Sequence, residues 1–259
     1  MLDYLQQDPG GFLLFMLYRA PAVLLALTLH ELAHGYMALR SGDPTAQMMG
    51  RLTLNPLKHL DPIGTLSLFL LGFGWAKPVP VNPANFRRGR RDDLLVSLAG
   101  VTVNFLLFLV MTVLAILLGH ALYTPQALQR LGGFRFFLAF GETGYTMQLF
   151  PEYADALSVI LKTPWLLHLQ RFVLHSCMIN LGLTVFNLLP IPPLDGFHVF
   201  NDILLGGRLK LSSKSFRIAQ AGLMILLFTT NIVGSVVSFL MNNVQAGVLT
   251  VLLPLLGGG

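Results

Sequence analysis

The sequence APAVLLALTLHELAHGYMAL, residues 20–39, is an apolar stretch that contains three ionisable side chains, His30, Glu31 and His34. Two histidines four residues apart project from the same face of a helix, so both imidazoles can bind one zinc ion. Glu31, beside them, can accept a proton from a water molecule at the metal. The stretch therefore predicts a hydrolytic zinc site inside a membrane-spanning helix.

The composition is that of an integral membrane protein. Charged residues are 11% of the 259 residues, whereas soluble domains contain about 25%. Apolar residues are 54%, and the mean hydropathy is +0.67. No repeat of fixed period stands out, and the segment 120–165 is too short for a typical independent domain. We therefore expect a single membrane-embedded domain over residues 1–259, with a core at about 20–200.

Four apolar stretches are long enough to cross a bilayer core of about 30 Å, which requires about 20 helical residues. They lie at 20–39, 94–118, 166–189 and 216–240. A shorter stretch, 62–73, is expected to be re-entrant or interfacial, and the run 248–256 is too short to span. The predicted fold class is an all-α polytopic membrane protein, a helical bundle with a short re-entrant or β-like segment between the first two core helices.

Basic residues predict the orientation of this bundle. With four crossings, segments 40–93 and 206–217 share one side of the membrane and hold most of the lysines and arginines. On the other side and its flanks are only Arg19, Arg130, Arg135, Lys162 and Arg171. The positive-inside rule makes the first side cytoplasmic, so the active site is reached from the cytoplasm and both termini lie outside. Lipid headgroups of the bilayer can satisfy the formal net charge of +5, and no nucleic-acid partner is expected.

The N-terminus and the single cysteine exclude two other features. The first residues lack a positive leader, and the first apolar stretch carries the histidine motif itself, so we expect no cleavable signal peptide. Cys177 lies within an apolar span, which leaves no intramolecular disulfide and no cysteine-based metal site. Core packing is its expected role.

A His-Glu-x-x-His string can arise by chance, and a lone buried histidine is usually a hydrogen-bonded core residue. Here three ionisable side chains share about one and a half turns of a membrane helix, where each charge at mid-bilayer costs about 2.5–3.5 kcal/mol. A bound metal would compensate that cost. His30 lies roughly 15 Å along the helix from Arg40, so the helices must enclose a polar cavity that admits water from the cytoplasm.

A catalytic zinc usually has three protein ligands and an open fourth position. Asp195 is the best candidate for the third ligand, because it ends the run NLLPIPPLDG (187–196), whose prolines interrupt the third span. Alternatively, Asp195 only caps the following helix, and its position alone leaves both interpretations open. His198 is a possible neighbour of the site. His59 and Asp61 could approach the cavity mouth but are not expected to be ligands.

Three elements together resemble the site-2 protease family of zinc metalloproteases, which cut transmembrane segments within the bilayer. They are HELAH at 30–34, AGVTVN at 99–104 and the run 187–196. The resemblance implies that His30, His34 and Asp195 bind Zn²⁺, that Glu31 is the catalytic base and that the substrates are transmembrane proteins.

The segments GDPTA (42–46), GRLTLNP (50–56) and GWAKPVPVN (74–82) further resemble a compact prokaryotic branch of that family. This resemblance implies a location in the prokaryotic cell membrane. Val101 replaces the proline usual after the glycine of the second motif, but Asn104 stays in place. The chain has no room for the extra peptide-binding or nucleotide-binding domains of some relatives, so substrate gating is open.

Asn104 and Asn187 are polar side chains placed where the spans approach the predicted cavity, and buried amides need hydrogen-bond partners. They could form interhelical hydrogen bonds, or they could hold the substrate or stabilise an oxyanion, as the resemblance favours. A substrate helix must unwind before cleavage, because its carbonyls are bonded internally. Extended segments in 45–82 could pair with the unwound strand or could only form cavity walls.

Two other functions compete with the intramembrane protease. One is a catalytically silent membrane scaffold or transporter with a structural metal site, which the presence of Glu31 disfavours because such a site needs no base. The other is a zinc peptidase that cuts soluble peptides at the membrane surface, which the depth of the motif disfavours. The sequence predicts neither the substrate nor the oligomeric state.

Overall fold

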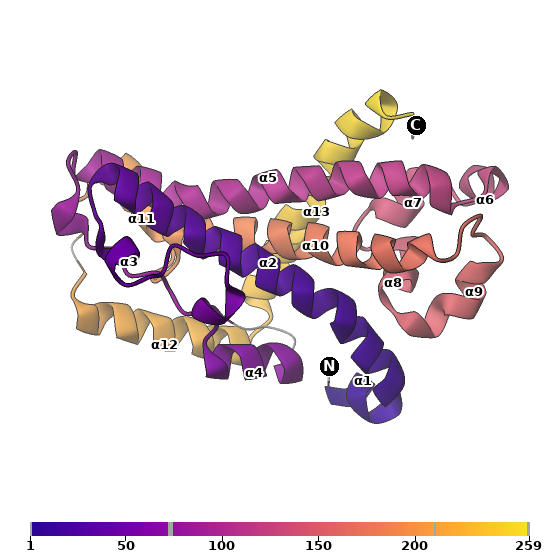
Figure 1. Cartoon of the computed structure of the whole chain (residues 1–259), viewed down its shortest axis with the longest axis horizontal. Coiled ribbons are helices and arrows are strands. Elements are labelled where there is room, and N and C mark those ends of the chain that lie inside the picture. Colours follow the sequence, from indigo (N-terminus) through magenta and orange to yellow (C-terminus); the bar gives the residue numbers. More distant parts are fainter. Residues whose placement is uncertain (1, 72–74, 210, 258–259) are drawn as a thin grey trace.

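The computed structural model describes residues 2–71, 75–209 and 211–257. In these ranges the regular structure is helical, and β pairing is limited to two isolated antiparallel bridges, Leu60–Ala76 and Tyr123–Leu161. In chain order (Figure 1), with η marking 3-10 helices, the elements are α1 (Leu2–Gln7), α2 (Pro9–Ser41), α3 (Thr45–Met48), η1 (Pro56–Lys58), α4 (Pro62–Leu71), η2 (Pro83–Asn85), α5 (Arg90–Leu122), α6 (Pro125–Arg130), α7 (Phe134–Leu138), α8 (Thr143–Leu149), η3 (Pro151–Tyr153), α9 (Ala154–Ser158), α10 (Leu166–Asn187), α11 (Asp195–Leu204), α12 (Ser213–Thr229) and α13 (Ile232–Leu255).

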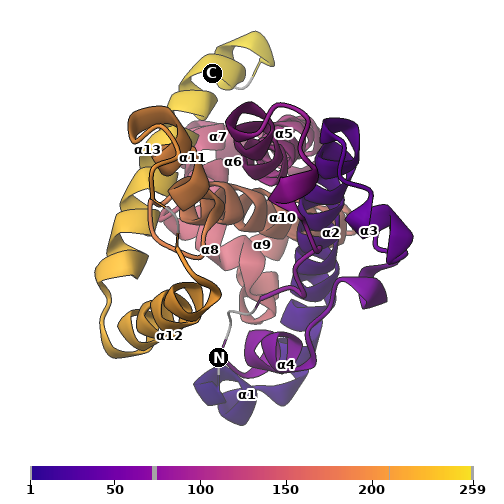
Figure 2. The same ribbon diagram turned by 90° about the vertical axis from the view of Figure 1, so that its left-hand side faces the viewer.

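Three long helices, α2, α5 and α10, form the centre of the molecule. They pack against one another more extensively than most other helices do, and Figures 1 and 2 show them running side by side. α2 and α5 have 33 residues each, about 50 Å, so both extend beyond a bilayer core of about 30 Å. α2 begins earlier than the apolar stretch because Phe12, Phe15 and Met16 are buried in a small cluster near its start. Its end at Gly42 has a positive φ of 108°, which suits glycine.

Within the described ranges, three helices are long and apolar enough to cross a membrane, namely α2, α5 and α13. α10, with 22 residues, has the length to span but carries polar side chains such as Gln170, Arg171 and Asn180, all of them buried in the bundle. The predicted all-α polytopic membrane protein is confirmed.

The prediction of one span at 216–240 is wrong, because two helices, α12 and α13, share that region. Thr230 between them is extended (φ −136°, ψ 155°), and α13 includes most of the run 248–256, which is too short to span alone, and ends at Leu255. The apolar pattern is nearly continuous, but Thr229 and Thr230 direct their hydroxyls to carbonyls one turn back, and the helix ends there. Such local bonds from threonine compete with the regular helix and favour a break.

The segment 62–73 contains the ten-residue helix α4, which at about 15 Å is too short to cross the bilayer. The end of that segment falls outside the described residues. From Trp75 to Asn82 the chain is extended without forming a regular strand, and Ala76 pairs with Leu60 in one of the isolated bridges. The short non-spanning segment between α2 and α5 thus agrees with the sequence prediction.

The two ends of the bundle differ. At one end, the short helices α6 to α9 cover an apolar core that includes Phe108, Phe137 and Leu174, all nearly or fully buried. Both ends of the described chain lie there, because Tyr4 packs against Phe150 (ring centroids 5.6 Å apart) and His120 Nε2 lies 2.9 Å from the carbonyl oxygen of Leu256. The other end, where α2 ends and α5 begins, carries the predicted site.

Candidate metal centre

His30 and His34 of α2 meet Asp195, the first residue of α11. Each offers one ligand atom, and the three atoms lie within 4.8 Å of one another. The two Nε2 atoms are 2.9 Å apart, and Asp195 Oδ2 lies 3.3 Å from His30 Nε2 and 3.2 Å from His34 Nε2. Asp195 makes no capping hydrogen bond, and the N-cap position of α11 is Leu194. The geometry therefore favours the ligand interpretation of Asp195 over the capping one.

Hydrogen bonds on the far side of each ring determine which nitrogen faces the cluster. His30 Nδ1 lies 2.5 Å from Asn104 Oδ1, and His34 Nδ1 lies 2.8 Å from the carbonyl oxygen of Val96. These oxygens can only accept, so each Nδ1–H donates and each Nε2 keeps its lone pair. Both imidazoles are thereby oriented with their lone pairs toward the same point.

The cluster fits a cation. With each Nδ1–H donating outward, the two Nε2 lone pairs and the Asp195 carboxylate oxygen converge on one point, and a positive charge there would stabilise this arrangement. Asp195 Oδ2 is also buried without a hydrogen-bond partner in the part of the chain described. Two histidine nitrogens and one carboxylate oxygen are a donor set of catalytic zinc sites, which keep a fourth position open.

Two glycines allow close packing around the ligand cluster, one between α5 and the histidine rings and one between α11 and the end of α10. A Cβ atom at Gly100 of α5 would lie 2.4 Å from His34 Nε2 and 2.6 Å from His30 Cε1, which are atoms of rings already held in place. A Cβ atom at Gly196 would lie 2.3 Å from the carbonyl oxygen of Leu188, so glycine lets α11 fold back on the end of α10. Gly100 belongs to a motif that the sequence singled out, but its contact with both rings was not predicted.

Glu31 lies on the same helix beside the two histidines and faces the same cavity. This cavity of about 770 Å³ is bounded by parts of α2, α5, α10, α11 and α12 and by the extended segment after α4. Glu31 Oε2 accepts a hydrogen bond of 2.7 Å from the backbone N–H of Val79 in that segment. The predicted base and the three predicted ligands therefore share one cavity.

Asn104 and Asn187 occupy different environments. Asn104 is fully buried behind His30, and its Nδ2 donates to Asn180 Oδ1 at 2.8 Å. Asn187 is only partly buried and lines the cavity, and its Nδ2 donates to the carbonyl oxygen of Leu183 at 3.0 Å. The sequence analysis missed Asn180, although an amide inside an apolar span was the signal for it.

The other polar residues considered from the sequence are not part of the ligand cluster. His59 is buried and its Nε2 bonds to the carbonyl oxygen of Thr53. Asp61 lines the cavity and accepts a hydrogen bond from the N–H of Gly64 at the start of α4. His198 also lines the cavity, and its hydrogen bond with Asp93 raises the pKa of its imidazole although burial acts in the opposite direction.

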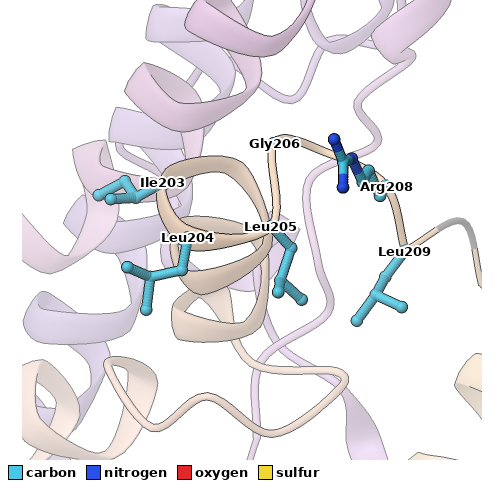
Figure 3. A pocket seen from close by; sticks show the side chains of 6 residues that line it. All are labelled: Ile203, Leu204, Leu205, Gly206, Arg208 and Leu209. Carbon is cyan, nitrogen blue, oxygen red and sulfur yellow. The ribbon is translucent and has the colours of Figure 1, made fainter.

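A second, smaller pocket lies at the end of α11 (Figure 3). It contains none of the predicted site residues and is lined by Ile203, Leu204, Leu205, Gly206, Arg208 and Leu209. The cavity at the histidine cluster is therefore the candidate active site.

Comparisons with known proteins identify the family of this chain. The model of Peptidase family M50 matches residues 18–230. The chain is 36% identical over 192 residues to the "Putative zinc metalloprotease YwhC" of Bacillus subtilis (strain 168), covering 74% of this chain and 71% of that protein. It is 32% identical over 133 residues to the "Putative zinc metalloprotease Rip2" of Mycolicibacterium smegmatis, and the match covers 49% of this chain and 49% of that protein. No solved structure matches the chain. The chain belongs to peptidase family M50, the site-2 protease family, and is a zinc-dependent metalloprotease of the membrane.

Proposed function

We propose that this metalloprotease hydrolyses peptide bonds in locally unwound transmembrane segments of membrane proteins. The position of the ligand cluster within a long apolar helix carries the proposal. His30 lies eleven residues, roughly 16 Å, before the end of α2 at Ser41, in a helix long and apolar enough to span the bilayer. A protease of soluble peptides has no need to place its metal within such a helix.

His30, His34 and Asp195 hold the zinc ion in this proposal. Bound there, zinc would supply a Lewis acid for the scissile carbonyl and would lower the pKa of an adjacent water to about 7. Glu31 accepts the proton of that water and later donates it to the departing amine. The hydrogen bond from the Val79 N–H leaves the second carboxylate oxygen of Glu31 for this transfer.

The two asparagines have different roles in the proposal. Asn104 orients the zinc ligand His30, because its Oδ1 accepts a hydrogen bond from His30 Nδ1. Asn104 is itself fixed by the hydrogen bond that its Nδ2 donates to Asn180 Oδ1. Asn187 lines the cavity and is the better candidate for contact with the substrate strand or with the developing oxyanion.

We further propose that the metal end of the bundle faces the cytoplasm and that both termini lie outside. Four exposed arginines just before α5 and in its first turn support this orientation through the positive-inside rule, namely Arg87, Arg88, Arg90 and Arg91. Single cysteines at positions 88 and 130, both exposed, can be labelled in intact cells, because the native Cys177 is buried. We expect the cysteine at position 88 to react only from the cytoplasm and the cysteine at position 130 only from outside. Labelling of both from one side would refute the orientation.

Glu31→Gln tests the proposed function. The amide fills nearly the same volume but cannot accept the proton, so the purified variant should keep zinc and lose cleavage. Proteomics of membranes should find transmembrane stubs that accumulate in a host with Glu31→Gln and disappear with the wild type. A stub recovered in this way, placed in lipid vesicles with the purified wild-type enzyme, should be cut within its membrane segment.

Three results would contradict the proposal. Substantial cleavage by pure Glu31→Gln would remove Glu31 from the role of the base. Cleavage of soluble peptides alone would indicate a surface peptidase. Equal stub levels in both hosts would indicate a scaffold that retains a structural metal.

A further inference from the structure

The extended segment 75–82, here called the strap, precedes η2 and forms one wall of the active-site cavity. Its lining residues include Trp75, Ala76, Pro78, Val79 and Val81. The sequence predicts that this segment either forms a cavity wall or pairs with the substrate strand. The structure places one of its backbone groups directly on the candidate base, since Val79 N–H donates to Glu31 Oε2 at 2.7 Å.

The sequence of the strap isolates that one donor. Pro78 and Pro80 flank Val79, and proline has no backbone N–H and a φ fixed near about −65°. Between positions 78 and 80, Val79 is therefore the sole residue that can donate a backbone hydrogen bond. The two prolines also restrict the backbone to the extended region, which limits the directions in which this N–H can point.

Buried polar groups hold the strap on both sides of Val79. Lys77 N–H donates to the carbonyl oxygen of His59 at 2.8 Å, and Arg51 Nη2 donates to the carbonyl oxygen of Lys77 at 2.7 Å. At the other end, Asn82 N–H donates to Asp43 Oδ2 at 2.7 Å. Arg51, His59 and Asp43 are all at least nine-tenths buried, so these anchors are parts of the interior.

The charge of one anchor is preserved at neutral pH. Burial raises the pKa of the Asp43 carboxyl, but hydrogen bonds from Asn82, Thr45 and Asn85 together lower that pKa below its ordinary value. Asp43 therefore remains a carboxylate and a strong acceptor for the N–H of Asn82.

Packing of Val79 against α2 sets the register of the strap. A Cβ atom at Gly35, one turn after Glu31, would lie 3.0 Å from Val79 Cγ1 and 2.6 Å from Leu52 Cδ2. Val79 itself is 7% exposed. Glycine at position 35 thus allows the valine side chain to lie against the helix, which brings its N–H to the carboxylate of Glu31.

We infer that the Val79 N–H is a positioning group for the catalytic base, held in place by the strap and its buried anchors. A glutamate side chain has several rotatable bonds, and a charge-assisted hydrogen bond to one oxygen restricts them. Misplacement of a reacting group by 1 Å can cost about a hundredfold in rate, so this restriction matters for turnover. The inference rests on the proposed role of Glu31 as base.

Amide exchange tests the hydrogen bond without any cleavage assay. In zinc-free protein labelled with ¹⁵N-valine, the Val79 amide should exchange at least about tenfold faster in Glu31→Ala than in the wild type, because the variant lacks the acceptor. Glu31→Gln keeps an acceptor oxygen and should show an intermediate rate. The amide of Val110 on α5 is the internal control and should not change. An unchanged Val79 amide in Glu31→Ala would overturn the inference.

Two substitutions at position 79 test the consequence for turnover. Val79→Pro removes the N–H and is compatible with an extended chain between two prolines, whereas Val79→Ala keeps the N–H and shortens the side chain. With the vesicle-bound stub as substrate, Val79→Pro should lower kcat at least about tenfold while zinc content and KM stay near the wild type. Val79→Ala keeps the N–H but loses part of the packing against Gly35, so it should lose clearly less kcat than Val79→Pro.

The outcomes separate this inference from the proposed function. Equal losses of kcat in both variants, or wild-type kcat in Val79→Pro, would overturn the positioning role while an inactive Glu31→Gln still supports the base. Cleavage by Glu31→Gln would instead refute the proposed function. If Val79→Pro does not fold, the exchange rate of the Val79 amide in Glu31→Ala decides.

Discussion

Two of the long helices of this bundle, α2 and α10, carry buried imidazoles, and only those of α2 have the surroundings of a metal site. His30 and His34 are 6% and 9% exposed, and His175 on α10 is 0% exposed. Both His30 and His34 have an acceptor at Nδ1 and a converging carboxylate at Nε2. Neither ring nitrogen of His175 has a hydrogen-bond partner among the residues that the structure describes. Burial in a membrane helix is therefore not what distinguishes a ligand.

The neighbours of His175 explain the difference. Phe15 packs edge-on against its ring, with centroids 4.9 Å apart, and Arg171 lies one turn away on the same helix. An aromatic ring and a cation supply no metal ligand, and the positive charge of Arg171 opposes another cation. A metal site in this fold instead requires a carboxylate from a second element and an acceptor behind each ring.

Of the variants considered, Asp195→Ala should have the largest effect on zinc binding. Loss of the carboxylate leaves two imidazoles, so we expect zinc content to fall far below one ion per chain and cleavage to fall to background. His175→Leu is the matched control, a buried imidazole of the same bundle, and should retain full zinc. Elemental analysis of both purified variants is the measurement. Normal zinc in Asp195→Ala would show that the third ligand lies elsewhere, and loss of zinc in His175→Leu would show that His175 also supports metal binding.

Gly100→Ala tests whether close approach of α5 is required for the metal site. The new Cβ atom would overlap both imidazole rings, so we expect zinc affinity to fall by about 10–100-fold, the range seen when the support of a ligand is disturbed. Gly247→Ala on α13 is the control, because nothing lies within 4 Å of a Cβ atom there. Competition with a zinc chelator measures both affinities. Equal affinities in the two variants would contradict the packing argument.

Substitutions of Asn104 and Asn187 separate two roles, the orientation of a metal ligand and contact with the substrate. Asn104→Leu removes the acceptor behind His30, so zinc affinity should fall by about tenfold or more. Asn187→Leu should keep its zinc and lose about tenfold in cleavage rate, equivalent to about 1.4 kcal/mol. Chelator competition and kinetics on the same preparations separate the two effects. Unchanged zinc affinity in Asn104→Leu would indicate that Asn104 serves only as an interhelical hydrogen-bonding residue.

Gln245→Leu at the opposite end should have the smallest effect on the metal. Gln245 accepts from Phe140 N–H at 2.6 Å and donates to the carbonyl oxygen of Leu138 at 2.7 Å. Its removal leaves both groups without this partner and should cost about 1–3 kcal/mol of stability, with zinc content unchanged. Thermal unfolding and metal analysis check the two parts. A loss of zinc would indicate that the two ends are coupled.

The sequence predicted those features that depend on local spacing. His30 and His34 are four residues apart in one apolar helix, so their shared face and the neighbouring Glu31 could be derived from helix geometry. Asp195 is remote in sequence, and only the family resemblance assigned it as a ligand, because the fold that brings α11 to α2 is not a local property.

Contacts between segments that are remote in sequence could not be predicted from helix geometry and local spacing. The bond from Val79 to Glu31 depends on the path of the strap, and the space at Gly100 depends on the distance between α2 and α5. The break at Thr230 was missed because the apolar pattern continues across it, whereas the backbone there responds to local side-chain hydrogen bonds.

The coordination of zinc in the purified protein tests the central claim most directly. X-ray absorption at the zinc edge should show two imidazole nitrogens and one carboxylate oxygen at about 2.0–2.2 Å, with an additional light atom in the open position. Asp195→Ala, reloaded with zinc, should lose the carboxylate contribution while the imidazole signal remains. A spectrum with a sulfur ligand, or one that Asp195→Ala leaves unchanged, would contradict the assignment of His30, His34 and Asp195 as the metal site.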